Sequence, residues 1–394
     1  MNQKQIYLDH AATTYLDSRV MKAMKPYFEE KYGNPGSLHQ KGLEAKEAVT
    51  KAREKVAELI KAKPEEIIFT SGGTESINLA LQETVYPNRE KGKHIITSKI
   101  EHPAVLETCK FLEKDGFTVT YLEVDKDGLV NPKEVEKAIR KDTILISIMY
   151  ANNEIGTIEP IAEIGTIAEK YKIPFHTDAC QAGGALDLNV KKLKVDLMTL
   201  NGSKIYGPKG IAILYKRAGI KMHPLIQGGG QEFGLRSGTE NVPAIVGFAK
   251  ALELAQKEKE AENKRLSGLR DYFVKEVLKK IPKTFLNGHP TKRLANNVNI
   301  SFLDVEGESV LLYLDQKGIM VSTGSACSSE KLEISHVLDA IGLKHDAAHG
   351  SIRFTLGKKT TKEELDYTVK ELIPIIKSLR KISPVHLNAE EIRK

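Results

Sequence analysis

The stretch of sequence from residue 143 to residue 177 reads TILISIMYANNEIGTIEPIAEIGTIAEKYKIPFHT. Its apolar run 143–150 predicts a buried strand, and the apolar residues of 161–171 recur at the spacing of an amphipathic helix. Residues 174–177 predict a second strand. A strand, a helix and a strand in this order are typical of a mainly parallel sheet that is covered by helices.

The same alternation extends outward over residues 45–215. Further strands are predicted at 67–70, 94–98, 119–122, 197–200 and 211–215, and further helices at 105–114 and 132–141. The fold class is therefore predicted to be α/β, with helices on both faces of the sheet. Ligands of such sheets bind where the strands end, so residues just after the strands are the first functional candidates.

The last third of the sequence predicts a second, smaller unit. A helix is predicted over 243–280, and its many Lys and Glu side chains suggest a solvated helix that leads away from the sheet. Strands follow at 299–302, 319–323 and 352–356 with helices between them, which indicates a smaller α+β domain. The 394 residues fit two domains at roughly 100–200 residues per domain.

Composition excludes several classes of protein. Charged residues make up 28% of the chain and hydrophobic residues 41%, as in soluble globular proteins. The net charge of +7 is spread along the sequence, which disfavours direct nucleic-acid binding through a basic arm. No apolar run is long enough to cross a membrane, and residues 1–8 contain no signal-peptide core.

Three widely spaced cysteines, Cys109, Cys180 and Cys327, argue against a disulfide framework and against a structural zinc site. We therefore expect a reducing, cytoplasmic environment. Cys109 has the apolar flanks of a buried cysteine. Cys327 stands among small and hydroxyl-bearing residues at 321–329, which suits a reactive thiol on a loop.

Three strand ends carry candidate chemistry. Residues 70–75 (TSGGTE) open a predicted helix over 76–84, and suit a phosphate or form a simple capped turn. In 176–181 (HTDACQ), Asp178 could be a metal ligand, a general base, the partner of a protonated ring nitrogen, or a helix cap. The pair Glu101-His102 could add metal ligands, but no H-E-x-x-H spacing supports a metal site.

Lysines and glycines mark two further segments. A lysine with a lowered pKa could form a Schiff base after the strand 197–200, and the residues alone leave Lys204 and Lys209 as alternatives. The glycine-rich segment 228–239 is no dinucleotide fingerprint. It is suited to contact a ligand, to contact a neighbouring subunit, or only to turn the chain.

Ten short motifs follow one another along the chain, and together they point to one family. They are YLDHAATT (7–14), YGNP (32–35), SGGTES (71–76), EHPAV (101–105), NNEIGT (152–157), HTDACQA (176–182), YGPKG (206–210), RSGT (236–239), GSAC (324–327) and SIRF (351–354). With these motifs the sequence resembles the pyridoxal-phosphate cysteine desulfurases, the NifS/IscS-like branch of the class V aminotransferase family, nearly from end to end.

The resemblance implies fold type I of the pyridoxal-phosphate-dependent transferases, with a mainly parallel seven-stranded sheet. It implies a large cofactor domain over 14–255 and a small domain made of 1–13 and 256–394. Lys204 would hold the cofactor covalently and move the substrate Cα proton. Asp178 would pair with the protonated pyridine nitrogen. His102 would stack on the ring and assist proton transfer. The remaining cofactor contacts would come from Gln181, Gly73, Thr74 and Ser203, and from Thr239 of the second subunit.

The same resemblance implies a desulfurase reaction. Arg353 would grip the substrate carboxylate, Asn153 would meet the substrate amine or the ring oxygen, and Asn34 would lie at the substrate entrance. Cys327 would attack the sulfur of cofactor-bound L-cysteine and keep it as a persulfide, while L-alanine leaves. No intrinsic metal is implied, although Cys327 could ligate a nascent iron–sulfur cluster in a scaffold complex.

The implied partners are a second copy of the chain and a sulfur acceptor, either an iron–sulfur scaffold protein or a tRNA-thiolation protein. Three positions depart from the family pattern: Ser203 replaces His, Asn201 replaces Ser, and Phe233 replaces a commonly basic residue. The alternatives are a selenocysteine lyase, an aminotransferase, and a non-catalytic sulfur-relay or scaffold protein. An exposed cysteine disfavours the aminotransferase, and the presence of Lys204, Asp178 and Cys327 disfavours the non-catalytic protein.

Overall fold

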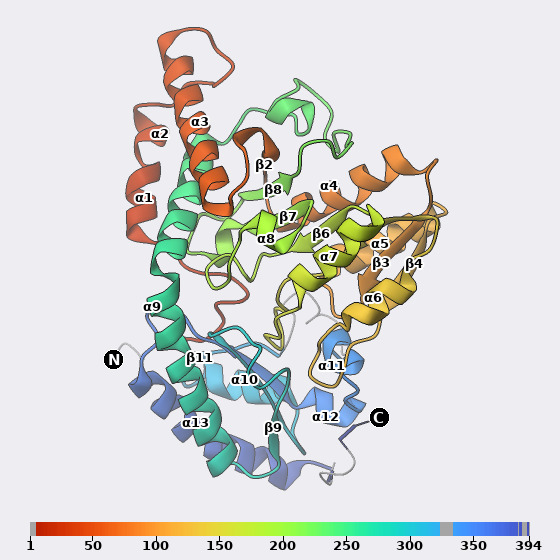
Figure 1. The fold of residues 1–394 in the computed structure, drawn as a ribbon. Coiled ribbons are helices and arrows are strands. Elements are labelled where there is room, and N and C mark those ends of the chain that lie inside the picture. Colours follow the sequence, from red (N-terminus) through yellow and green to blue (C-terminus); the bar gives the residue numbers. More distant parts are fainter. Residues whose placement is uncertain (1–4, 324–333, 385, 388–391, 394) are drawn as a thin grey trace.

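A seven-stranded sheet lies at the centre of the larger part of the chain (Figure 1). The computed structural model describes residues 5–323, 334–384, 386, 387, 392 and 393. In spatial order the strands are β2 (Ile67–Thr70), β8 (Ala212–Lys216), β7 (Leu197–Asn201), β6 (Phe175–Asp178), β5 (Thr143–Ser147), β3 (His94–Ser98) and β4 (Thr118–Leu122). Only β8 runs antiparallel to its neighbours, so the predicted mainly parallel sheet is confirmed.

Alternating strand residues build a core on each face of this sheet. Ile68, Ile95 and Leu145 pack on one face, and the neighbouring residues Ile67, Ile96 and Ile146 pack on the other, as the two-residue period of a strand requires. The first face is covered by α4 (Gly73–Val85) and α5 (Pro103–Lys114). The second is covered by α3 (Gln40–Ile60), α6 (Pro132–Ala138), α7 (Ile161–Tyr171), α8 (Val190–Leu193) and the start of α9 (Val242–Lys280), with α1 (Ser18–Met24) and α2 (Pro26–Glu29) beside them.

Several predicted boundaries need correction. The strand predicted at 143–150 ends at Ser147, although Ile148 N still donates to His176 O at 3.1 Å. The helix predicted at 132–141 ends at Ala138. The helix predicted at 76–84 already begins at Gly73, so that Gly73 and Thr74 belong to the first turn of the helix.

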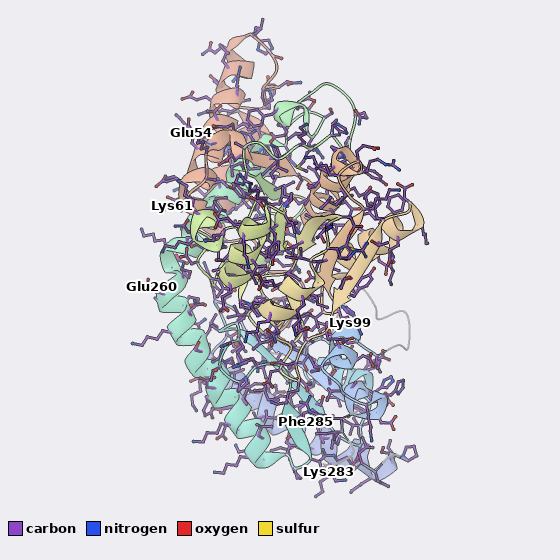
Figure 2. All side chains as sticks on the ribbon, turned by 45° about the vertical axis from the view of Figure 1, so that its right-hand side comes forward. Glu54, Lys61, Lys99, Glu260, Lys283 and Phe285 are labelled. Carbon is purple, nitrogen blue, oxygen red and sulfur yellow. The ribbon has the colours of Figure 1, made fainter. Side chains whose placement is uncertain are left out.

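The prediction of a solvated helix over 243–280 is wrong for its first half. The side chains of Phe248 and Leu252 in α9 are fully buried in the core against the sheet, with α3 and α1 packed beside them. Small and apolar residues fill this half, and most of the charges begin near residue 257. Phe273 and Val277 then pack in the second core, while Glu260 lies exposed on the outer side of the helix (Figure 2). One helix therefore stabilises both parts of the molecule.

The C-terminal part is a smaller α+β unit, as predicted. Its antiparallel sheet has the order β12 (Ser351–Thr355), β10 (Asn297–Phe302) and β9 (Thr284–Leu286), and β1 (Ile6–Tyr7) pairs in parallel with β11 (Ile319–Met320). The remaining helices are α10 (Gly307–Asp315), α11 (His336–Ala340), α12 (His345–His349) and α13 (Lys362–Ile382). The strand predicted at 319–323 thus covers only two residues, and the boundaries 14–255 and 256–394 stay a prediction. Among the described residues, no helix has the length and apolar character of a membrane span.

The N-terminal segment ties the two parts together. After β1, the His10 ring and Thr355 O are hydrogen-bonded at 2.9 Å, beside the small sheet. Thr14 N then donates to Ser203 O, and its hydroxyl accepts from Tyr206 N, both at 2.9 Å. The segment therefore fixes the turn that follows β7, where one of the two candidate lysines lies.

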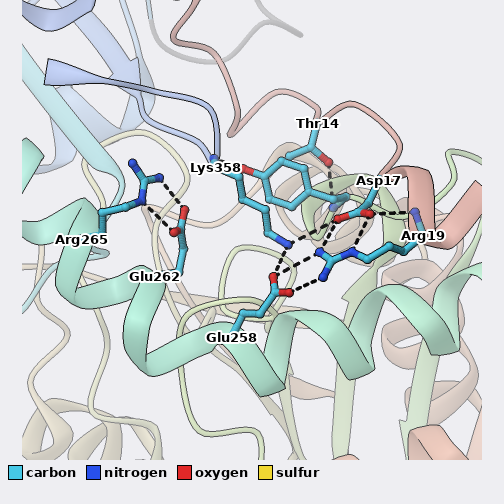
Figure 3. Close-up of polar contacts among 8 residues, drawn as sticks. Thr14, Asp17, Arg19, Glu258, Glu262, Arg265 and Lys358 are labelled. Carbon is cyan, nitrogen blue, oxygen red and sulfur yellow. Dashed lines mark hydrogen bonds and ion pairs between the residues drawn. The ribbon is translucent and has the colours of Figure 1, made fainter. Parts of the chain in front are cut away.

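An ion network at the start of α1 reinforces this junction (Figure 3). Asp17 accepts two hydrogen bonds from the Arg19 guanidinium, at 3.0 and 2.7 Å. Lys358 and Arg19 both pair with Glu258 of α9, at 2.7 and 2.6 Å. The hydrogen bonds from Arg19 lower the pKa of Asp17 to about 2. The network joins α1, α9 and the loop after β12.

Replacing Asp17 by asparagine is expected to lower the free energy of unfolding by about 1–2 kcal/mol at pH 7. Asparagine keeps the helix-capping oxygen and loses the charge. Because the folded pKa lies below the ordinary value of 3.8, the contribution is complete above pH 3.8 and is lost as the pH falls toward 2. Urea unfolding at pH 7 and at pH 3 measures it. Asp142→Asn, which removes an exposed ion pair, should change stability by less than about 1 kcal/mol.

Candidate active site

A cavity of about 250 Å³ lies where the parallel strands end. Many of the residues that line it directly follow strands, as expected for a mainly parallel α/β sheet. Eight predicted site residues line it: Gly73, Thr74, His102, Asn153, Asp178, Gln181, Lys204 and Arg353. Segments from six regions of the chain therefore converge on one chamber.

Lys204 and Lys209 occupy different places, although they are only five residues apart. Lys204 ends the short turn after β7, and its Nζ donates to Ala11 O at 2.7 Å and to Ala12 O at 2.6 Å inside the cavity. Burial lowers the pKa of this amine. Lys209 instead lies in a neighbouring cavity and donates to Thr14 O at 3.3 Å. Of the two lysines, Lys204 has the location that an amine nucleophile requires.

Asp178 and His102 form the polar walls near this amine. Asp178 ends β6, is 6% exposed, and accepts a hydrogen bond from Cys180 N at 2.9 Å. His102 caps α5 by accepting from Ala104 N through Nδ1 at 3.1 Å. A neutral His102 therefore carries its proton on Nε2. Burial lowers the pKa of His102, which favours this neutral ring at pH 7.

Glu101 does not join His102 as a metal ligand. Its side chain is fully buried, and its Oε1 accepts hydrogen bonds from Ser98 Oγ at 2.7 Å and from Met149 N at 2.9 Å. Burial raises the pKa of Glu101 to about 8, so the group is mostly a neutral acid at pH 7. The metal site suggested by the pair Glu101-His102 is therefore not supported.

The other end of the cavity is a helix N-terminus. Gly73 is the first residue of α4, and a Cβ atom on it would lie 3.1 Å from Cys180 Sγ and 3.3 Å from Asn201 Nδ2. Glycine thus leaves the backbone open to an approaching group. The first N–H groups of a helix have no partner within the helix and favour an anion, which suits a phosphate.

Arg353 reaches the same chamber from the small sheet. It lies in β12, is 2% exposed, and donates to Asn153 O at 3.1 Å and to Asp9 Oδ1 at 2.8 Å. Its Nε is buried and has no hydrogen-bond partner among the described residues. A bound carboxylate would supply the missing acceptor.

Most of the chain matches a known protein family. The aminotransferase class-V family model matches residues 6–368, which is most of the chain. The chain belongs to the class V aminotransferase family. It is 58% identical to the cysteine desulfurase IscS of Dictyoglomus turgidum, over 97% of both chains. It is 48% identical to the human cysteine desulfurase, over 97% of this chain and 84% of the human protein.

Solved structures agree with this assignment to class V. A NifS-like protein superposes with a TM-score of 0.90 and 41% identity, over 95% of this chain and all of the other. The structure of SspA in complex with cysteine gives a TM-score of 0.80 and 39% identity, over 89% of this chain and 99% of the other. These neighbours place the chain in the NifS/IscS-like branch of the class V family.

Members of this branch depend on pyridoxal phosphate, and the cavity of this class V chain fits that group. The Lys204 amine suits the aldehyde of the cofactor, and the Asp178 carboxylate suits its ring nitrogen. The helix N-terminus at Gly73 suits its phosphate. At the phosphate end, the missing Cβ of Gly73 supports the fit, because it leaves the backbone at the start of α4 open to a ligand.

Three predicted residues do not line the cavity in the single chain. Ser203 donates through its N and its Oγ to Asn201 Oδ1, both at 3.1 Å, so the two departures from the class V pattern contact each other. Asn201, not Ser203, lines the cavity. Thr239 and Asn34 are exposed and lie outside the lining, and their predicted roles involve a second subunit and the entrance.

Two ion pairs hold the glycine-rich segment 228–239 against the rest of the fold. Glu232 is buried and bonds with both Nη atoms of Arg53, at 2.8 and 2.6 Å. Arg236 Nε donates to Glu75 Oε1 of α4 at 3.0 Å. Phe233 is exposed and lies against the Arg53 guanidinium at 4.9 Å. The departure at Phe233 thus forms a cation–π contact with the body of the fold.

Of the three cysteines, Cys327 lies outside the described residues. Cys109 is fully buried, as predicted. Cys180 lines the cavity, and burial raises the pKa of its thiol. The described flanks of the Cys327 segment both contact the site: Ser322 pairs with the backbone of Arg353, and the His336 ring lies 2.8 Å from Glu101 O.

Sequence reasoning missed the part played by the N-terminal segment. The motif 7–14 was noted for its resemblance only, yet Asp9, Ala11 and Ala12 contact Arg353 and Lys204 directly. Nothing in the local pattern of this segment predicts these contacts, because their partners lie about 190 to 340 residues away.

Proposed function

We propose that this protein is a pyridoxal-phosphate-dependent cysteine desulfurase. L-Cysteine and the thiol of Cys327 react to give L-alanine and a persulfide on Cys327. The carbon–sulfur bond of the substrate breaks and a sulfur–sulfur bond forms, so no outside oxidant or reductant enters this step. The observation that carries the proposal is the convergence of Lys204, Asp178 and Arg353 on one cavity in a chain 48–58% identical to cysteine desulfurases.

The cofactor supplies an electron sink that stabilises negative charge at the substrate Cα. Lys204 then holds and moves the Cα proton, because burial lowers the pKa of its amine. Asp178 keeps the pyridine nitrogen protonated through its negative charge. His102 lines the cavity as a neutral ring with a proton on Nε2 and assists proton transfer. Gln181, which lines the cavity, would donate to the phenolic oxygen of the bound ring.

Arg353 and Asn153 orient the substrate. Arg353 receives the carboxylate through its free N–H groups, and Asn153 lies next to it. Gly73 and Thr74 would hold the phosphate end, and Ser203 would act there beside Asn201, to which its hydroxyl donates. Cys327 supplies the thiolate that takes the sulfur, and its segment has both described flanks at the site.

The test is the product of L-cysteine turnover by the purified, cofactor-loaded protein with a thiol reductant. L-Alanine and sulfide in equal amounts support desulfuration. A keto acid in place of alanine would mean transamination and would contradict the proposal. Absence of any product from cysteine together with turnover of L-selenocysteine would favour the lyase.

The pH dependence of cofactor capture follows from the lowered pKa of Lys204. Only the neutral amine attacks the aldehyde, so the rate at which apoprotein captures pyridoxal phosphate should rise with pH. It should level off below pH 10.5, the ordinary value for a lysine, because the pKa is lowered. Stopped-flow absorbance from pH 6 to pH 10.5 measures this rate. A rate that still rises tenfold per pH unit at pH 10 would contradict it.

We further propose that two copies of the chain form a dimer, in which Thr239 of one copy completes the phosphate site of the other. Exposed apolar side chains between residues 21 and 43 support a protein contact here, since such groups seldom cluster on a monomer. They are Met21, Phe28, Tyr32, Leu38 and Leu43. Light scattering on the purified protein measures the mass in solution.

The sulfur acceptor is proposed to be an iron–sulfur scaffold or a tRNA-thiolation protein in the cytoplasm, with no direct contact to nucleic acid or membrane. In a scaffold complex Cys327 could ligate the growing cluster. Transfer of labelled sulfur from Cys327 to each purified acceptor distinguishes the two.

A further inference from the structure

Asp9 is the one carboxylate in direct contact with Arg353 among the described residues. Asp9 Oδ1 accepts from Arg353 Nη2 at 2.8 Å, and the side chains are 17% and 2% exposed. The backbone of Asp9 is fixed independently, because Tyr7 Oη donates to Asp9 O at 2.9 Å and Asp9 bridges to Thr355. The backbone that carries this carboxylate is therefore held in place by groups other than Arg353.

Arg353 has N–H groups that no contact within the described residues uses. A guanidinium has five N–H groups in a planar fork. One group donates to Asn153 O and one to Asp9. The Nε–H group is buried and has no hydrogen-bond partner in the described part of the chain. These two contacts fix the plane of the fork and leave Nε–H with further N–H groups for a carboxylate.

Asp9 also sets the charge of the site. Asp9 and Arg353 neutralise each other. Arg353, Asp178 and Lys204 line the cavity, and Asp9 contacts Arg353 from outside this lining. Because Asp9 offsets the charge of Arg353, a second carboxylate on a ligand bound at Arg353 would gain little further attraction and would be repelled by the Asp9 charge.

We propose that Asp9 is a positioning and specificity-determining residue for the amino-acid substrate. It orients Arg353 toward the α-carboxylate and disfavours amino acids with a second negative charge. This inference rests on the proposed function, in which Arg353 binds the substrate carboxylate.

Two substitutions separate orientation from charge. Asp9→Asn keeps an oxygen that accepts from Nη2 and removes the charge. Asp9→Ala removes both. We expect Asp9→Ala to raise the KM for L-cysteine by about tenfold or more, with kcat within about threefold, since a hydrogen bond to a charged group is lost. We expect the KM of Asp9→Asn to stay within about threefold of the wild type.

The charge effect is measured with two amino acids that carry no sulfur to transfer. L-Alanine has one carboxylate and L-aspartate has two, and calorimetry on the cofactor-loaded protein gives both dissociation constants. In Asp9→Asn we expect the ratio of the aspartate constant to the alanine constant to fall by about tenfold. A merely structural role for Asp9 would not change this ratio. An unchanged ratio in Asp9→Asn, or an unchanged KM in Asp9→Ala, would overturn the inference.

Arg353→Ala separates this inference from the proposed function. If Arg353→Ala raises KM and Asp9→Ala does not, the role of Asp9 fails and the role of Arg353 stands. If Arg353→Ala leaves KM unchanged, the carboxylate role of Arg353 fails, and the inference fails with it. In the double variant we expect no further rise in KM beyond that of Arg353→Ala, because Asp9 acts through Arg353.

Discussion

Replacing Lys204 by alanine is expected to lower alanine production from L-cysteine by about 10⁴-fold. In the proposed mechanism the variant loses both the amine that holds the cofactor and the group that moves the Cα proton, and no other lysine lines the cavity within the described residues. Borohydride reduction followed by peptide mass analysis gives a second readout. The wild type should carry the cofactor on the peptide with residue 204, and the variant should carry none.

Lys209→Ala is the matched control. Its Nζ contacts Thr14 O at 3.3 Å in the neighbouring cavity, so this variant should retain activity within about threefold and keep the reducible adduct. A cofactor fixed to residue 209 in Lys204→Ala would reverse the two assignments.

Replacing Cys327 by serine is expected to stop persulfide formation and to lower alanine production by at least about 10³-fold, while the cofactor stays bound. Transfer of sulfur needs a thiolate, and a hydroxyl at the same position is far less nucleophilic toward sulfur. Mass analysis after one addition of L-cysteine shows which cysteine gains a sulfur atom. The absorbance of the bound cofactor checks that the site stays intact.

Cys180→Ala tests the other thiol at the site. Burial raises the pKa of Cys180, which leaves little thiolate at neutral pH, so we expect the persulfide to stay on Cys327 in this variant. A persulfide found on Cys180 in Cys327→Ser would show instead that the cavity thiol takes the sulfur.

The sequence predicted the central sheet well because its signals are local. Each strand carries its own apolar run, and the helix 161–171 has the bounds of its prediction. The first half of α9 was mistaken for a solvated helix because the charges of its second half dominate the average over a long segment. The predicted start at residue 76 was wrong because a glycine pair lowers helix propensity, whereas α4 begins at Gly73.

The candidate site was predictable only in part. Residues after strands, such as Asp178 and Lys204, could be selected from the pattern, but the choice between Lys204 and Lys209 depends on the direction of each side chain. The contact of Asp9 with Arg353 joins residues 344 positions apart, and neither partner carries a local signal of the other. Such contacts are set by tertiary packing, which hydrophobic periodicity does not encode.

The parallel pairing of β1 with β11 has a consequence for synthesis on the ribosome. Ile6 pairs with Ile319, and the residues that follow β1 reach Thr355 and Ser203. The residues of β1, which are among the first to be made, therefore pair only after the last quarter of the chain has been reached. Contacts at such separation form late. A nascent chain that stops short of residue 319 should thus be unable to retain the cofactor, and loading should follow release of the finished polypeptide.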